Sequence, residues 1–218
     1  MKTIIKNIGN KNIKAKVEEP LSFHVETLFN ILSKVEDKLI DGFSIQIGWS
    51  VYSLYKYEEY YQIITQDYTK NPFKDTTEDL TIALWVQLEQ SHCLRRLNIE
   101  GQLIKFNDKI VIAKNVLQQE EVYLQRSSGC DEGDSGWYIG PINEEVSGEL
   151  EIIYAYQLLK MKPEIIQVLA LPYNYLVVFE KDKIKAILNE YDVDIWDEIE
   201  KNEVNIMEKF HEGLENEC

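Results

Sequence analysis

The sequence predicts an α+β fold of mostly antiparallel sheets with packed helices, divided into two small domains. Several segments alternate apolar and polar residues, which is typical of strands with one buried face. Between them lie segments whose apolar residues recur every three or four positions, as in amphipathic helices. A short polar segment, Glu100-Gly101-Gln102, lies near the middle of the 218 residues. It predicts a boundary between domains 1–101 and 102–218 whose short linker keeps them close together.

The first domain is expected to begin with a strand over 4–17 and a helix over 22–39. Ser22 is a suitable N-cap, and Gly42 follows the helix end. Two strands, 45–51 and 59–68, are expected to form a hairpin. The segment 76–100 is ambiguous, because residues 80–88 alternate as in a strand, whereas Thr77 and the acids after it indicate a helix start. We favour the helix.

The second domain is expected to contain three strands at 109–117, 121–126 and 136–142. A helix is expected over 147–161, with Ser147 as its cap and Pro163 after its end. Further strands are expected at 165–171 and 175–180, followed by another short element at 183–188. The tail 192–218 holds ten acids and two lysines. Its apolar residues recur at helical spacing, so we expect an amphipathic helix with an acidic outer face.

Composition limits the partners that the chain can bind. There are 23 Lys and Arg residues against 38 Asp and Glu, a net charge of −15. Nucleic acids and anionic membranes repel such a chain, so neither is an expected partner. A basic protein is a suitable partner. In many acidic proteins, however, the negative charge serves only to keep the protein soluble. No apolar run reaches the length of a membrane helix and no secretion signal is recognisable, which favours a cytoplasmic location.

Reactive side chains do not form a known catalytic or metal-binding pattern. Cys93, Cys130 and Cys218 are widely spaced, and their odd number does not suit a disulfide framework or a zinc site. The three histidines are scattered, so no catalytic triad follows from local spacing. We therefore predict no catalytic residues, no metal and no cofactor.

The densest local signal is the segment 129–140, which holds four glycines and three acids before a Trp-Tyr-Ile run. It predicts an acidic turn that leads into a strand. We select Asp131, Asp134, Trp137 and Tyr138 as candidate binding residues. Trp137 has two interpretations, a core anchor or an exposed contact beside acids that recognises a cationic partner. We favour the core. Asp134 has a structural alternative too, which is to bond backbone amides within the turn.

The segment Asp134-Ser135-Gly136-Trp137, followed by a helical stretch and Pro163-Glu164-Ile165-Ile166, resembles immunity protein family thirty-three of bacterial polymorphic toxin systems. That domain was formerly a domain of unknown function. The resemblance covers roughly residues 104–188. It implies a non-enzymatic protein that neutralises a cognate protein toxin by occluding it, and it leaves the role of domain 1–101 and the oligomeric state open. The alternative is a small-molecule-binding, metal-binding or hydrolytic domain that uses the acidic loop.

Overall fold

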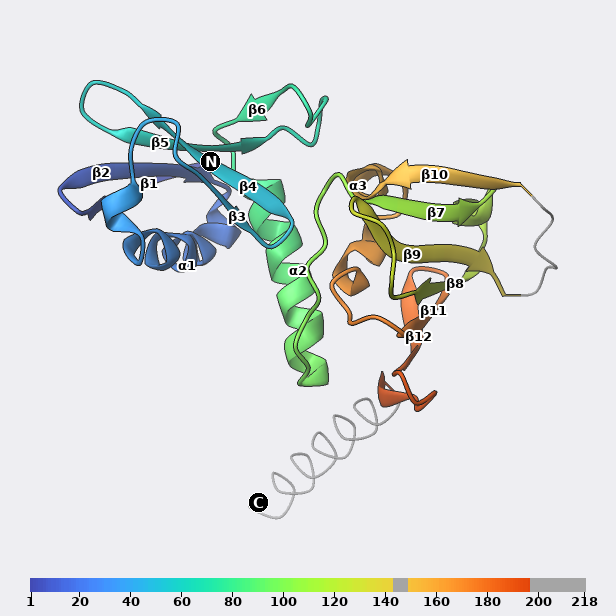
Figure 1. Ribbon diagram of the computed structural model, residues 1–218. Helices are drawn as coiled ribbons and strands as arrows, with labels where there is room; N and C mark the ends of the chain where they lie inside the picture. Colours follow the sequence, from blue (N-terminus) through green and yellow to red (C-terminus); the bar gives the residue numbers. More distant parts are fainter. Residues whose placement is uncertain (143–148, 197–218) are drawn as a thin grey trace, which may run out of the picture. The chain divides into compact units, whose positions relative to one another are not determined.

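The computed structural model describes residues 1–142 and 149–196 (Figure 1). The chain forms two compact units, unit 1 (Met1–Ser91) and unit 2 (His92–Cys218). The expected boundary at 100–102 stays a prediction about where the chain can be divided into parts that fold alone. Nearly all of the predicted tail helix, 192–218, lies outside the described residues.

Unit 1 contains one mixed six-stranded sheet. Its main strand order is β1-β2-β5-β4-β3, with β6 paired to β5, and only β2 and β5 run parallel. The elements of unit 1, with α2 continuing past its end, are β1 (Lys2–Ile8), β2 (Lys11–Val17), η1 (Glu19–Leu21), α1 (Ser22–Ser33), η2 (Glu36–Lys38), β3 (Ser44–Ile47), β4 (Ser50–Lys56), β5 (Tyr61–Gln66), β6 (Thr76–Thr77) and α2 (Thr81–Leu97).

The core of unit 1 lies between its sheet and α1, which covers one sheet face (Figure 1). Val25, Leu28, Phe29 and Leu32 recur at helical spacing along α1 and are buried. They pack against alternate residues of the strands, such as Ile13 in β2. The expected helix over 22–39 therefore exists, but α1 ends at Ser33. The expected first strand is in fact the β1–β2 hairpin.

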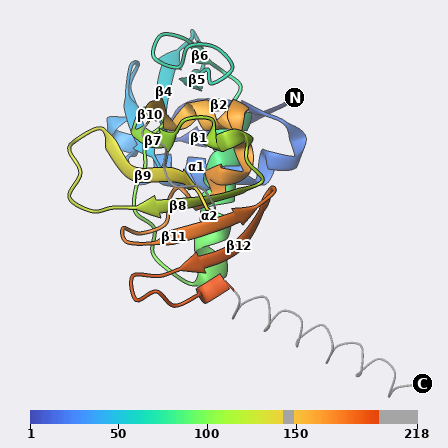
Figure 2. The same cartoon turned by 90° about the vertical axis from the view of Figure 1, so that its right-hand side faces the viewer.

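Unit 2 contains a second mixed sheet, with strand order β10-β7-β9-β8-β11-β12 (Figure 2). Of the strands that the structure describes in this unit, only β7 and β9 are paired in parallel. The elements are β7 (Lys109–Ala113), η3 (Val116–Gln118), β8 (Glu121–Arg126), β9 (Asp134–Pro141), β10 (Leu150–Tyr154), η4 (Ala155–Gln157), α3 (Leu158–Met161), η5 (Pro163–Val168), β11 (Leu176–Glu180) and β12 (Lys183–Leu188).

The α+β prediction is confirmed, and so is the helical interpretation of residues 81–88, which form the start of α2. The expected helix start at Thr77 is wrong, because Thr76–Thr77 form β6 and the Asp79 carboxylate accepts the Thr81 N–H where α2 begins. The alternation of 80–88 reflects apolar residues on more than one side of a helix, because Leu80, Leu84 and Val86 are all buried. Among residues 1–142 and 149–196, no helix is long and apolar enough to cross a membrane.

Two predictions in unit 2 are wrong. Residues 150–154 of the expected helix form strand β10, because their Leu-Glu-Ile-Ile-Tyr sequence pairs with β7 and helical structure begins only at Ala155. Ser147, the expected cap, is outside the described residues. The expected strand 165–171 is instead occupied in part by η5. Pro163 opens that 3-10 helix at a position where its fixed φ favours a helix start.

Candidate functional site

The acidic loop between β8 and β9 is held mainly by its own backbone. The Ser127 N–H donates to the Gly136 carbonyl at 2.9 Å, and the Asp134 N–H donates to the Asp131 carbonyl at 3.1 Å. Gly136 has φ +79°, and a Cβ built on it would clash with the Ser127 carbonyl oxygen. Glycine is therefore required at this position for both conformation and space. The predicted acidic turn is present and leads directly into β9.

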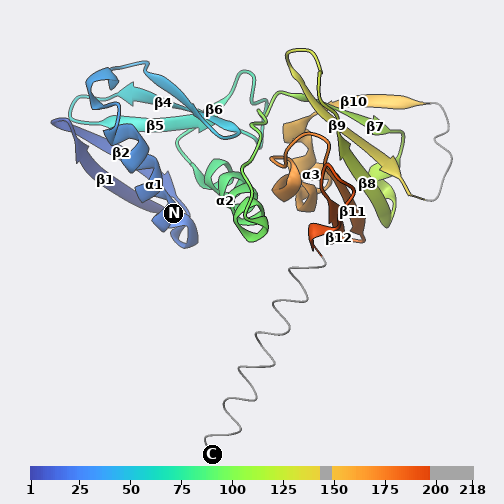
Figure 3. The same cartoon turned by 60° about the horizontal axis from the view of Figure 1, so that its bottom comes forward.

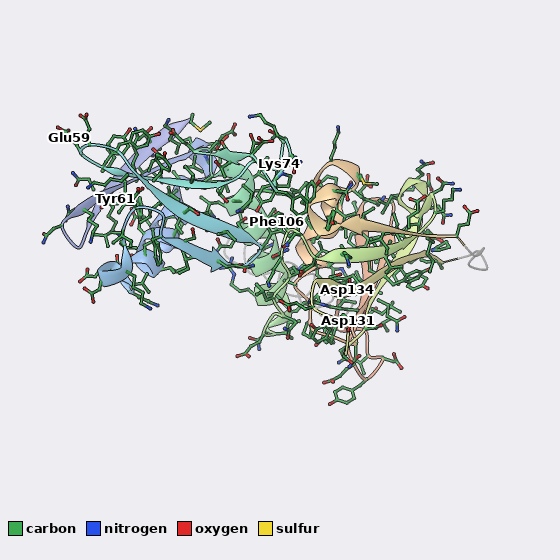
Figure 4. The ribbon with its side chains drawn as sticks, turned by 45° about the horizontal axis from the view of Figure 1, so that its top comes forward. Glu59, Tyr61, Lys74, Phe106, Asp131 and Asp134 are labelled. Carbon is green, nitrogen blue, oxygen red and sulfur yellow. The ribbon has the colours of Figure 1, made fainter. Side chains whose placement is uncertain are left out.

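The two candidate aspartates lie on the same side of unit 2 and are exposed (Figure 4). The Asp134 carboxylate lies 3.9 Å from the Lys109 ammonium on β7, as a partly exposed ion pair. Asp131 and Glu132 precede it on the surface of the loop. In the part of the chain that the structure describes, no group of three or more His, Cys, Asp or Glu side chains could hold a metal ion.

Ser135 joins the two parallel strands of unit 2. Its hydroxyl donates to the Lys109 carbonyl on β7 at 2.7 Å and accepts the N–H of Trp137 at 3.1 Å. The residue is buried. Near this point the register of β7 and β9 shifts between Lys109 and Val111. Buried backbone polar groups require hydrogen-bond partners. The Ser135 hydroxyl supplies them where the irregular ladder between β7 and β9 does not.

Trp137 is a core residue with 1% of its surface exposed. Its indole Nε1 donates to the Leu169 carbonyl at 2.9 Å, which fastens the segment after η5 to the sheet. The core interpretation of Trp137 matches this geometry, whereas a direct partner contact would need the ring to be at the surface. The sequence could not identify the carbonyl that receives the indole, because Leu169 is 32 residues away.

Arg126, at the end of β8, is the residue that sequence analysis missed. Its guanidinium is buried and donates to five carbonyls: Gln102, Leu103, Ser135, Leu169 and Leu171. It also lies over the Tyr173 ring, 4.7 Å from the centroid. A signal was available, because Val122, Leu124 and Arg126 alternate along β8 and therefore share its buried face.

Burial lowers the pKa of the Arg126 guanidinium, and nearby Tyr173 and Asp108 oppose this effect. Arginine nevertheless keeps its proton in proteins because its ordinary pKa is so high. The buried cation is thus stabilised by carbonyl dipoles and aromatic rings. Ser135, Trp137 and Arg126 together fasten three segments, 102–103, 134–137 and 169–171, around the end of the sheet.

Comparison with protein-family models shows that the Imm33-like domain matches residues 89–198, slightly more than half of the chain. The chain belongs to the Imm33-like family. The resemblance predicted over 104–188 lies inside this range and is confirmed. The Imm33-like match includes every described residue of unit 2 from β7 to Trp196, and only its first residues, 89–91, belong to unit 1. No curated protein and no solved structure matches the chain.

The remaining candidate, Tyr138, lies on the sheet face of the Imm33-like domain opposite to Trp137. The centroids of the Tyr138 and Tyr123 rings are 5.7 Å apart, and both rings lie against Gly140. A Cβ built on Gly140 would approach the two rings to 2.6 and 2.8 Å. Burial, and then Tyr123, raise the pKa of the Tyr138 phenol. Tyr138 is half-buried, so only part of its ring is available to a partner.

Proposed function

We propose that this chain is an immunity protein that binds a cognate protein toxin and blocks it by occlusion, without catalysing a reaction. The observation that carries the proposal is the Imm33-like match over residues 89–198. Immunity in this sense requires binding and nothing more, and the contacts of the Asp-Ser-Gly-Trp segment suit it, since Ser135 and Trp137 are occupied in holding the fold.

The toxin is expected to be basic. Unit 2 contains 13 Lys and Arg against 25 Asp and Glu, so it carries −12 of the net −15. A field of this kind attracts a cationic surface and raises its rate of association. We propose Asp131 and Asp134, together with Tyr138, as contacts on unit 2, because the two aspartates are exposed and Tyr138 is only half-buried.

The decisive experiment is to look for a toxin gene among the neighbours of this gene, to co-express the two, and then to titrate the purified proteins. We expect the chain to restore growth, to form a complex of fixed composition, and to inhibit the toxin in proportion to the amount added. Complete inhibition by a small fraction of an equivalent would indicate catalysis and contradict occlusion. No complex and no protection would contradict the proposed function altogether.

A second measurement tests the electrostatic part. If acidity steers the toxin, the association rate should fall steeply with salt, because charges more than about 8–10 Å apart are screened near physiological ionic strength. The dissociation rate should change much less. Substituting Gln for Glu203, Glu208, Glu212 and Glu215 removes four negative charges from the tail. An unchanged association rate and salt slope in this folded variant would exclude steering by the tail.

A further inference from the structure

The edge of the unit 2 sheet at β10 lacks the features that usually protect an edge strand. Among the strands of residues 1–142 and 149–196, β10 pairs with β7 alone and ends the sheet (Figure 3). Natural proteins commonly place lysine on such edges to prevent pairing with other chains. The opposite edge, β12, carries Lys183 and Lys185, and β1, an edge of the unit 1 sheet, carries Lys2 and Lys6. β10 carries no lysine, and its only charged residue is Glu151.

An apolar stripe runs along the same strand. Leu150, Ile152 and Tyr154 alternate and so share one face, on which Leu150 is 56% and Ile152 is 67% exposed. The stripe continues inward across the sheet, since Ile152 lies beside Val111 and Val111 beside Tyr138. An exposed apolar patch of this kind in a soluble protein marks an interaction surface.

The backbone of β10 is directed outward at the same residues. The Ala155 N–H donates to the Asp108 carbonyl, and the Lys114 N–H donates to the Glu149 carbonyl. These bonds place the odd-numbered positions of β10 in hydrogen-bonded pairs with β7. In an antiparallel ladder the even-numbered positions, Leu150 and Ile152, then direct their N–H and C=O groups to the open edge. At Tyr154 the N–H is already taken by Gln157 Oε1 at 2.8 Å, which ends the open segment.

Two lysines beside the stripe are paired within the chain. Lys109 faces Asp134 at 3.9 Å, and Lys114 is paired with Glu149. The centre of this face is therefore apolar and uncharged. It is complementary to another apolar, uncharged strand edge, and much less so to the basic toxin surface proposed above.

We propose that β10 pairs antiparallel with β10 of a second copy of this chain, giving a two-fold symmetric dimer with one continuous sheet. With the axis at Ile152, this residue exchanges both backbone hydrogen bonds with its own copy, and Leu150 lies opposite Tyr154. Glu151 then lies opposite Ile153, so no like charges face each other directly. This inference is independent of the proposed toxin binding.

The test is the mass of the purified full chain in solution, by light scattering during size-exclusion chromatography over a range of concentrations. We expect a dimer of twice 25.6 kDa that dissociates on dilution. Ile152→Lys should give a monomer, because it places two like charges opposite each other on the axis. Ile5→Lys is the matched control, since Ile5 is 60% exposed on the edge strand β1 but has Thr3 and Asn7 beside it. This variant should remain dimeric.

Salt provides an independent measurement. Because each copy carries −15, screening should strengthen the dimer, whereas it should weaken association with a basic toxin. A wild-type monomer at all concentrations, a dimer that survives Ile152→Lys in a folded protein, or a monomer produced equally by Ile5→Lys would overturn the proposal. A monomer whose toxin protection is lost in Ile152→Lys would instead assign this edge to the toxin.

Discussion

The two units have sheets of similar construction but hold their chains together differently. Each sheet has six strands and one parallel pair. In unit 1 a regular helix, α1, covers the sheet, and apolar side chains fill the space between them. In unit 2 the short segments η4, α3 and η5 lie on one face of the sheet (Figure 3). The buried carbonyls of Leu169 and Leu171, which follow η5, need donors that no regular ladder supplies, and Arg126 and Trp137 provide them.

The difference shows that an irregular layer needs specific side-chain donors, which a regular helix does not. A helix satisfies its own backbone, so apolar spacing alone is sufficient to position α1. The segment 169–171 is buried but does not form a regular helix that satisfies its own backbone. The Arg126 guanidinium, with its five N–H donors, binds two of its carbonyls, those of Leu169 and Leu171. The Asp-Ser-Gly-Trp segment is thus part of a fastening that unit 1 does not need.

The largest expected effect comes from removing that fastening. Arg126→Ala should destabilise unit 2 by at least about 3–5 kcal/mol, because it leaves buried carbonyls without donors and opens a cavity. Denaturant unfolding should show a shifted transition for unit 2 and an unchanged one for unit 1. Lys183→Ala, at an exposed position on β12, is the control. An Arg126→Ala protein as stable as the wild type would show that the carbonyls find other partners. It would contradict the claim that unit 2, unlike unit 1, depends on a buried side-chain donor.

This contrast also explains which parts of the fold the sequence predicts. The burial of Val25, Leu28, Phe29 and Leu32 depends on local spacing, and so the helix that contains them was predictable. β8 was predicted at its observed bounds, 121–126, for the same reason. The conformations of 150–154 and 165–171 depend instead on pairing with β7 and on distant donors such as Arg126. Local propensity cannot include such partners, so both predictions failed there.

The candidate site was predictable to a similar extent. The glycine-rich acidic turn and the strand that starts with the motif follow from local chemistry. Arg126 was missed although its position in the β8 alternation indicated a buried side chain. Its acceptors come from 102–103, 135 and 169–171, and only the folded chain brings these segments together.

A smaller effect is expected at Ser135, within the same fastening. Ser135→Ala leaves the Lys109 carbonyl and the Trp137 N–H without their partner, at a cost of about 1–3 kcal/mol. The change should appear in the unfolding of unit 2 alone. Ser128→Ala, on the exposed part of the loop, should have no measurable effect. Equal stabilities of the two variants would show that the hydroxyl is dispensable and that water replaces it.

The third prediction concerns two tyrosines of unit 1, the buried Tyr52 and the half-buried Tyr68. Burial raises the pKa of Tyr68 to about 12 from 10.0, and it raises the pKa of Tyr52 as well. Between pH 10 and about pH 12, Tyr68 loses its proton in the unfolded chain but keeps it in the folded chain. The free energy of unfolding therefore falls as the pH rises through this range. At pH 11 the loss from Tyr68 is about 1.4 kcal/mol. In Tyr68→Phe the stability of unit 1 should fall less steeply between pH 9 and 12. If the stability of both proteins fell equally steeply with pH, the raised pKa of Tyr68 would be contradicted.

The smallest expected effect on stability is at Asp134, the first residue of the motif, and it separates structure from function. Its pair with Lys109 is long, at 3.9 Å, and both side chains are nearly half exposed. Surface ion pairs contribute little, so Asp134→Asn should change the free energy of unfolding by less than about 0.5 kcal/mol. A loss comparable to that of Ser135→Ala would make Asp134 part of the fastening.

If Asp134 is a toxin contact, the asparagine variant should bind the toxin more weakly at unchanged stability. Lys109→Gln removes the same ion pair while keeping the carboxylate, and it should bind as well as or better than the wild type. Equal toxin affinity in all three proteins would remove Asp134 from the proposed interface.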